Sequence, residues 1–435
     1  MIKFLGYSLL LTFLGFGQSS FAQTSAQDQP SKLESGATPA PTQSSIQSNI
    51  QNNTPSSRTN TQESKAEVGG KTNNLTNNLT NNQNSQSNSL KHKKPRPPLL
   101  SNRNAVKFSA RFGESEDVKV LATQIAISQS IPEKWVLDQL ARARSIPSVI
   151  QQMTPAPAPV QKNWQAYRAR FIEPKRIGLG VQFWQKFAST LKQAERDFGV
   201  PPEIIIGILG IETLYGQHMG AYPVLDSLAT LSLQFPKEHP RAAERQAFFQ
   251  NELGAFLKEQ YSRPNPTHKE VLGSYAGAIG AAQFMPSSIA KFAVDYDKDG
   301  VIDLIHSPYD AIGSIANYFK MYGWQTGQPT RFSITLNSNP TQLEELLVPD
   351  ILPTFNASTL ESKGVILSND GKAYPGLLAL IELQNGPEPK SYLAGTENFY
   401  VVTRYNWSSY YAMAVLDLGI AVREAYAGSL LNDNH

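Results

Sequence analysis

One apolar stretch, residues 201–216, constrains the fold more than any other part of the sequence. It begins with Pro201 and Pro202, which a first helical turn tolerates because its N–H groups have no intrahelical partner. Glu203 follows at the positive end of the helix dipole, and Gly216 supplies a stop. The stretch therefore predicts a helix built mainly from isoleucine and leucine.

Glu212 lies on the apolar stripe of this predicted helix. Helical steps of three, four, seven and eight residues back from it reach Leu209, Ile208, Ile205 and Ile204. Burial disfavours a charged carboxylate and raises its pKa, which keeps a glutamate protonated near neutral pH as a general acid. A buried glutamate that is hydrogen-bonded or ion-paired for structural reasons gives the same pattern. On this stretch alone, both interpretations stay open.

Composition excludes several classes of function. The 435 residues contain no cysteine, which rules out disulfides, thiolate metal sites, a catalytic cysteine and a lipidated N-terminal cysteine. The six histidines are scattered without zinc-site spacing. The formal charge of +3 is too small to argue for nucleic acid and is compatible with an anionic polymer. We therefore expect no nucleic-acid partner.

Residues 1–22 have the features of a secretory signal peptide. Lys3 gives the positive start, residues 4–16 form an apolar run, and residues 20–22 are a small-x-small cleavage site. The run is short for a membrane span, although an uncleaved anchor is the alternative. We therefore expect the mature chain to be exported.

Residues 23–100 are rich in Ser, Thr, Asn, Gln and Pro and contain no Phe, Tyr or Trp. Such a composition buries too little apolar surface to offset chain entropy, so we predict a disordered linker. Its basic tract, residues 91–98, is either a contact for an anionic surface or a solvated spacer. The linker is also a candidate site for binding partner proteins.

Regular periodicity begins near residue 104 and predicts a mainly helical chain with a small β-rich subdomain at 330–402. Alternating prolines at residues 155–159 interrupt the helices. The predicted helices are Val118–Ser128, Pro132–Arg144, Trp164–Ile172, Gly178–Phe198, Leu225–Leu233, Pro240–Glu259, Tyr309–Met321 and Ala412–Tyr426. The predicted strands are Arg331–Asn337, Gly364–Leu367, Leu378–Leu383 and Phe399–Thr403, with a turn at residues 385–387.

The run at residues 273–288 is unusually rich in glycine and alanine. Small residues let the backbone approach another object closely, which is either a packed helix or a ligand. Gln283, within this run, suits a hydrogen-bonding role in a cleft.

The loop from Asp295 to Asp303 matches the start of a calcium-binding loop, with Gly300 at the sharp turn. Loop position 12 is His306 instead of a carboxylate, and Asp310 follows four residues later. A structural calcium ion is one interpretation, and an acidic turn that caps the next helix is the other. The predicted ligands are Asp295, Asp297, Asp299, Val301 through its main-chain carbonyl, and Asp303.

Residues 404–411 combine tyrosines and a tryptophan with an asparagine. Flat aromatic rings stack on the apolar faces of pyranoses while amides pair with hydroxyls, so the segment suits a sugar cleft. The alternative is a helix capped by Ser408 with tyrosines in the core.

Four blocks together resemble the membrane-bound lytic transglycosylase B family: residues 207–213, 273–288, 310–319, and 404–406 with 411–414. The resemblance covers about residues 104–427. It implies an α+β, predominantly α fold, with a lysozyme-like helical catalytic domain and the small β-rich subdomain near the C-terminus. It also implies cleavage of the β-1,4 bond between N-acetylmuramic acid and N-acetylglucosamine in peptidoglycan glycan strands, leaving 1,6-anhydromuramyl ends.

By this resemblance Glu212 is the single catalytic acid/base. The chemistry needs no cofactor, and we expect the protein to be a monomer. The family's single metal loop coincides with the acidic loop, which favours a structural Ca²⁺. Residues that would line the groove are Tyr167, Arg245, Ser274, Gln283, Tyr318, Tyr405, Asn406 and Tyr411.

Three departures and two rival functions accompany the resemblance. Residues 235–245 are longer than the family's compact Pro-Arg-Arg run, so only Arg245 is carried over there, and Phe248 replaces a tyrosine. The acidic loop is a residue longer before Asp310, which leaves its last ligand open. The rivals are a hydrolysing muramidase on the same fold, which needs a second carboxylate or a positioned water, and a non-catalytic glycan-binding protein of the cell wall.

Overall fold

The computed structural model describes residues 106–155, 161–263, 270–337 and 342–432. The predicted signal peptide and linker, and residues 156–159 of the predicted proline break, lie outside these ranges. None of the helices in the described ranges is both long enough and apolar enough to cross a membrane.

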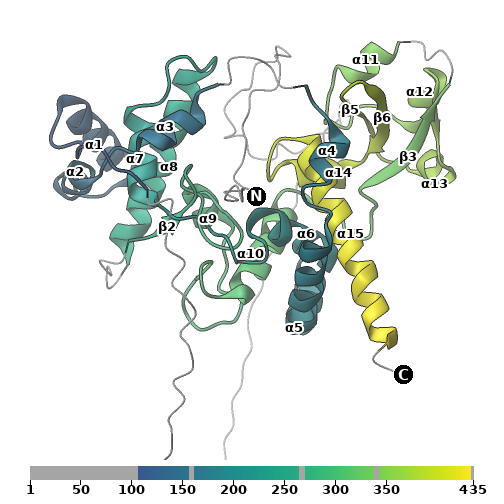
Figure 1. Ribbon diagram of the computed structural model, residues 1–435, viewed down its shortest axis with the longest axis horizontal. Coiled ribbons are helices and arrows are strands. Elements are labelled where there is room, and N and C mark those ends of the chain that lie inside the picture. The colour runs from purple at the N-terminus through teal and green to yellow at the C-terminus, as the bar shows by residue number, and fades with distance from the viewer. Residues whose placement is uncertain (1–105, 156–160, 264–269, 338–341, 433–435) are drawn as a thin grey trace, which may run out of the picture. The chain divides into compact units, whose positions relative to one another are not determined.

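Helices dominate the described chain, and one small antiparallel sheet lies near its C-terminal end, as predicted (Figure 1). The helices are α1 (Glu116–Gln129), α2 (Glu133–Arg142), α3 (Pro147–Met153), α4 (Trp164–Arg168), α5 (Pro174–Phe198), α6 (Pro202–Thr213), α7 (Val224–Leu233), α8 (Ala242–Ser262), α9 (Pro286–Phe292), α10 (Pro308–Met321), α11 (Leu343–Leu347), α12 (Ala357–Ser362), α13 (Asn369–Ala373), α14 (Glu397–Thr403) and α15 (Ser409–Asn432). The strands are β1 (Tyr222–Pro223), β2 (Leu272–Gly273), β3 (Arg331–Leu336), β4 (Val365–Leu367), β5 (Ala379–Asn385) and β6 (Glu388–Gly395).

Helix α6 is the centre of the largest hydrophobic core and packs against α5 and α15 (Figure 1). Every residue from Ile204 to Thr213 is buried, so the helix has no solvent-exposed face along this span. The sequence had indicated only an apolar stripe on one side of the helix. Gly207 permits the close approach of α15, because a Cβ atom there would lie 2.3 Å from the main-chain oxygen of Val415. Glu212 is therefore held in a rigid, apolar setting.

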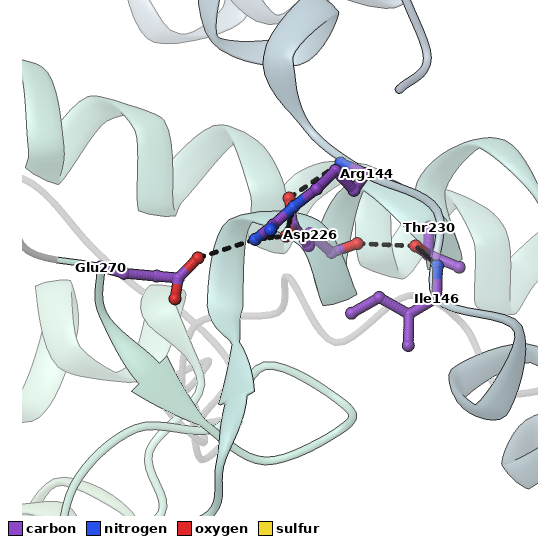
Figure 2. Close-up of polar contacts among 5 residues, drawn as sticks. All are labelled: Arg144, Ile146, Asp226, Thr230 and Glu270. Atoms are coloured by element: carbon purple, nitrogen blue, oxygen red, sulfur yellow. Dashed lines mark hydrogen bonds and ion pairs between the residues drawn. The ribbon is translucent and has the colours of Figure 1, made fainter. Parts of the chain in front are cut away.

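A second core joins α1, α2 and α3 to α7 and α8, and a polar network anchors it. Figure 2 shows Arg144, which follows α2, donating to the buried carboxylate of Asp226 from its main chain (2.9 Å) and its guanidinium (2.6 Å). The same guanidinium reaches Glu270 at 2.9 Å, and the main-chain N–H of Ile146 donates to Thr230. The network ties the N-terminal helices to α7 and to the segment that leads into β2.

The small sheet has the strand order β4-β3-β6-β5 and is antiparallel throughout. The predicted turn at residues 385–387 is confirmed, because Asn385 pairs with Glu388 across a hairpin with Gly386 at φ +66°. The sequence missed β6, whose first half is polar and lacks clear alternation.

The predicted strand Phe399–Thr403 is wrong, because this segment is helix α14. The side chain of Thr396 caps the helix at the N–H of Phe399, and the β-branched residues that follow are buried in the central core. Tertiary burial overrides their strand propensity here. Helix α4 is also shorter than predicted and ends at Arg168, and α2 ends at Arg142 because Ala143 is extended.

Candidate active site

Glu212 lies in the last turn of α6 and is only 7% exposed. The hydroxyl of Tyr411, from the first turn of α15, donates a hydrogen bond of 2.6 Å to its Oε1. Burial raises the pKa of the Glu212 carboxyl to about 7, and the hydrogen bond from Tyr411 opposes part of that rise. The side chain therefore holds its proton close to neutral pH.

Three predicted groove tyrosines gather around Glu212. Tyr405 and Tyr411 are stacked with ring centroids 6.3 Å apart. Burial raises the pKa of both well above the usual value, and the Glu212 charge raises it further. Burial, with a smaller contribution from Glu212, raises the pKa of Tyr167 to about 12. These hydroxyls remain protonated and can donate to a carboxylate or a sugar.

Thr213, the residue after Glu212, fixes the end of α6. Its hydroxyl donates to the main-chain oxygen of Ala281 at 2.9 Å and accepts the N–H of Gly216 at 2.9 Å. The chain then turns sharply, with Leu214 and Tyr215 both at positive φ. Sequence reasoning missed this role, although a buried polar residue beside Glu212 was the available signal.

Most of the small-residue run forms tight turns before α9, and a packed helix is one of its close neighbours, because a Cβ atom at Gly277 would lie 2.5 Å from the side chain of Leu228 on α7. Ser274 is buried, and its hydroxyl accepts the N–H of Ala278 at 2.8 Å. Gln283 has φ +51°, and its amide nitrogen donates to the main-chain oxygen of Gly280 at 2.9 Å. No described residue hydrogen-bonds the buried Oε1 of Gln283, so that oxygen can accept a hydrogen bond from a ligand.

Two hydrogen bonds hold the turn at residues 404–408. Tyr318 donates to the main-chain oxygen of Arg404 at 2.7 Å, and Tyr405 donates to that of Ala282. The amide of Asn406, in the same turn, is half-buried and has no hydrogen-bond partner among the described residues. Its donors and acceptor are thus available to a ligand.

The predicted groove residue Arg245, on α8, lies near the small-residue run that contains Ser274. Arg245 lies over the rings of Phe248 (5.1 Å) and Phe249 (5.3 Å). Its charge also lowers the pKa of Tyr275, although burial is the larger cause and raises that pKa to about 12. Tyr275 is the direct neighbour of Ser274, so Arg245 lies on the side of the small-residue run.

Sequence reasoning missed a charged network that positions α4, the helix carrying Tyr167. Asp417 on α15 accepts from Arg168 of α4 (2.7 Å) and from Arg331 of β3 (2.7 Å). It also missed the contact between Tyr167 and Tyr410, whose ring centroids lie 5.9 Å apart. These contacts join residues far apart in the chain, so no local pattern indicates them.

The acidic loop brings three of its five predicted ligands together. Carboxylate oxygens of Asp295, Asp297 and Asp299 all lie within 4.8 Å of one another, a spacing and chemistry that fit a hard cation. Asp303 is bonded elsewhere: it accepts from the main chain of His306 and pairs with its ring at 2.9 Å. The fully buried Asp310 accepts the N–H groups of Tyr296 and Asp303, one on each carboxylate oxygen. These two hydrogen bonds hold both ends of the acidic loop in place.

Residues 113–420 match the family described as the transglycosylase SLT domain. The match spans the helical cores, the small sheet and every residue placed at the site above. The chain belongs to this family.

Similarity to individual relatives supports the same family assignment. The chain is 34% identical over 330 residues to membrane-bound lytic murein transglycosylase B of Escherichia coli, covering 73% of this chain and 86% of the relative. The crystal structure of the Escherichia coli lytic transglycosylase Slt35 in complex with calcium has a TM-score of 0.61 and 33% identity, covering 75% of this chain and 98% of that one. SltB3 from Pseudomonas aeruginosa in complex with NAG-anhNAM-pentapeptide has a TM-score of 0.58 and 25% identity, covering 71% and 79%. The protein is a lytic murein transglycosylase, an enzyme that acts on peptidoglycan.

Proposed function

We propose that Glu212 is the only acid/base of the reaction and that it serves both halves of one turnover. The observation that carries the proposal is a carboxyl group that is buried, bonded to Tyr411 at 2.6 Å and raised in pKa to about 7. A group with such a pKa donates a proton readily near neutral pH and takes one back readily after ionising.

In the first half, Glu212 gives its proton to the glycosidic oxygen between N-acetylmuramic acid and N-acetylglucosamine. The bond from C1 to that oxygen breaks, and the N-acetyl carbonyl of the muramyl residue stabilises the positive charge at C1. In the second half, the Glu212 carboxylate removes the proton from the C6 hydroxyl as that oxygen attacks C1. The product is a 1,6-anhydromuramyl end, the proton returns to Glu212, and no water is consumed.

The other buried carboxylates support a single-carboxylate mechanism. Among the described residues these are Asp226, Glu252 and Asp310. Asp226 pairs with Arg144, Glu252 accepts two hydrogen bonds from Ser287, and Asp310 holds the acidic loop. Each is engaged away from Glu212, whereas typical glycosidases place two carboxylates across the bond.

The surrounding polar groups would hold the glycan. The Tyr167 and Tyr405 rings flank Glu212, while the free acceptor of Gln283 and the amide of Asn406 suit hydroxyl and N-acetyl groups. Tyr318 and Ser274 shape the groove through their main-chain bonds, and Tyr411 keeps Glu212 in place. Arg245 adds positive charge, which suits the carboxylates of peptidoglycan stem peptides.

The acidic loop is proposed to bind one structural calcium ion. The carboxylates of Asp295, Asp297 and Asp299 and the carbonyl of Val301 would hold it, with Asp303 after a change of partner. An ion there would stabilise the loop that precedes α10 and would take no part in the proton transfers.

The substrate puts the enzyme in the cell envelope, and the signal-like residues 1–22 favour the periplasm as the compartment. Peptidoglycan glycan strands are the proposed partner, because relatives bind fragments of them. Recruitment of cell-wall proteins through residues 23–100 remains a prediction.

Digestion of purified sacculi tests the proposal. Wild-type enzyme should release muropeptides lighter by one water, about 18 Da, than those released by a hydrolase, because no water enters the product. Glu212→Gln should fold, bind sacculi and release none. Hydrolysed ends in the wild-type digest would favour the muramidase alternative, and absence of any release would favour a glycan-binding protein.

A further inference from the structure

Trp407 is the most exposed aromatic side chain among the described residues, with 46% of its surface accessible. Exposing the apolar surface of an indole ring to water is unfavourable. Large aromatic rings contribute strongly to binding when a ligand covers them. The residue lies in the turn between α14 and α15, directly after Asn406. Its role is not explained by the core, because it belongs to none of the buried clusters.

The ring is braced from the protein side. The guanidinium of Arg404 lies 4.7 Å from the centre of the Trp407 ring, and the ring of Tyr400 contacts it edge-on at 6.1 Å. Arg404 also lies 5.6 Å from the Tyr400 ring and 5.5 Å from the Tyr322 ring. Such cation–π stacking restricts the indole to one place while much of its surface stays in contact with solvent. A ring held in this way loses little conformational freedom when it binds a ligand.

The braced ring is fixed to the proposed groove. The main-chain oxygen of Arg404 accepts the hydroxyl of Tyr318, and Tyr405 in the same turn is bonded to Ala282 and stacks on Tyr411. Trp407 has no ring contact with Tyr405 or Tyr411 among the described pairs. The turn therefore offers two parts to a ligand: Tyr405, which stacks on the Tyr411 ring beside Glu212, and the exposed ring of Trp407.

We propose that Trp407 forms an additional sugar-binding subsite, stacking on the apolar face of an N-acetylhexosamine of the glycan strand other than the two that flank the cleaved bond. This proposal rests on the function proposed above. The subsite makes affinity depend on glycan length.

Binding to soluble oligomers of N-acetylglucosamine tests the subsite. The measurements use the full chain carrying Glu212→Gln, so that no cleavage occurs, with oligomers of three and six sugars as probes. Adding Trp407→Ala should weaken binding of the six-sugar probe about tenfold and should affect the three-sugar probe less. Trp407→Phe keeps a ring face and should recover most of the affinity. Tyr261→Ala removes another exposed aromatic ring, 44% accessible and on α8, and should leave both affinities unchanged.

Two results would overturn the subsite. Equal affinity of the Trp407→Ala and parent proteins for the six-sugar probe would show that the ring binds no sugar. An equal loss for both probes, together with a lower melting temperature, would show that the ring only braces Arg404. The Glu212 assignment is tested separately. The measurement is the identity of the products that the Trp407→Ala variant, with Glu212 intact, releases from sacculi.

Discussion

The environment of Glu212 predicts how the stability of the protein depends on pH. Burial raises the pKa of this carboxyl from its ordinary 4.5 to about 7 in the folded chain. Between these two values the folded protein keeps a proton that the unfolded chain has released. The contribution of this group to the free energy of unfolding is therefore fully present below pH 4.5. It falls by about 1.4 kcal/mol for each pH unit as the pH rises from 4.5 to 7 and is lost above that. The total loss is about 3 kcal/mol.

Glu212→Gln removes this dependence, because the amide does not ionise and its oxygen can still accept the Tyr411 hydroxyl. Urea unfolding of both proteins at about pH 4 and pH 8 gives the comparison. The variant should gain about 3 kcal/mol over the wild type between the two conditions, while every other titrating group cancels in the difference. A difference in unfolding free energy that stays constant over this range would refute the buried, proton-holding Glu212.

Three further predictions concern neighbouring parts of the molecule. Tyr411→Phe deletes the hydrogen bond that lowers the pKa of Glu212, so the alkaline limb of the kcat/KM–pH profile should move to higher pH; an unchanged limb would separate Tyr411 from the acid. Calcium chloride should raise the melting temperature of the wild type relative to chelator, and Asp297→Asn should reduce that rise; equal shifts in both proteins would exclude Asp297 as a ligand. Gly207→Ala should destabilise by about 1–3 kcal/mol because its methyl group collides with α15, whereas Gly428→Ala, on an open part of α15, should stabilise by about 0.5–1 kcal/mol; denaturant midpoints of the two variants decide this, and similar midpoints would contradict the close helix packing.

Sequence reasoning succeeded where one helix carries the whole signal. The burial of Glu212 follows from apolar neighbours within eight residues, and the structure confirms it. Its partner Tyr411 lies 199 residues away, so periodicity could not pair them, and the family resemblance supplied Tyr411. The sequence did not predict the Asp417 network for the same reason, because the network joins α4, β3 and α15.

Errors in the predicted elements have local physical causes. The Phe399–Thr403 segment has strand-like residues, but Thr396 provides a helix cap that was visible in the sequence. A polar side chain a few residues away decides that outcome, and the dominant pattern concealed it. The predicted ligand Asp303 is bonded to His306, the residue that departs from the calcium-loop pattern, so its role as a ligand stays a prediction.

The origin of the oxygen at the new sugar end tests the central claim most directly. Wild-type enzyme would digest sacculi in water enriched in heavy oxygen, and the products would be weighed at once by mass spectrometry. If Glu212 acts alone and the C6 hydroxyl is the nucleophile, the new muramyl ends are anhydro and carry no heavy oxygen. Muramyl ends that carry one heavy oxygen each would show that water attacks C1, and would contradict the account.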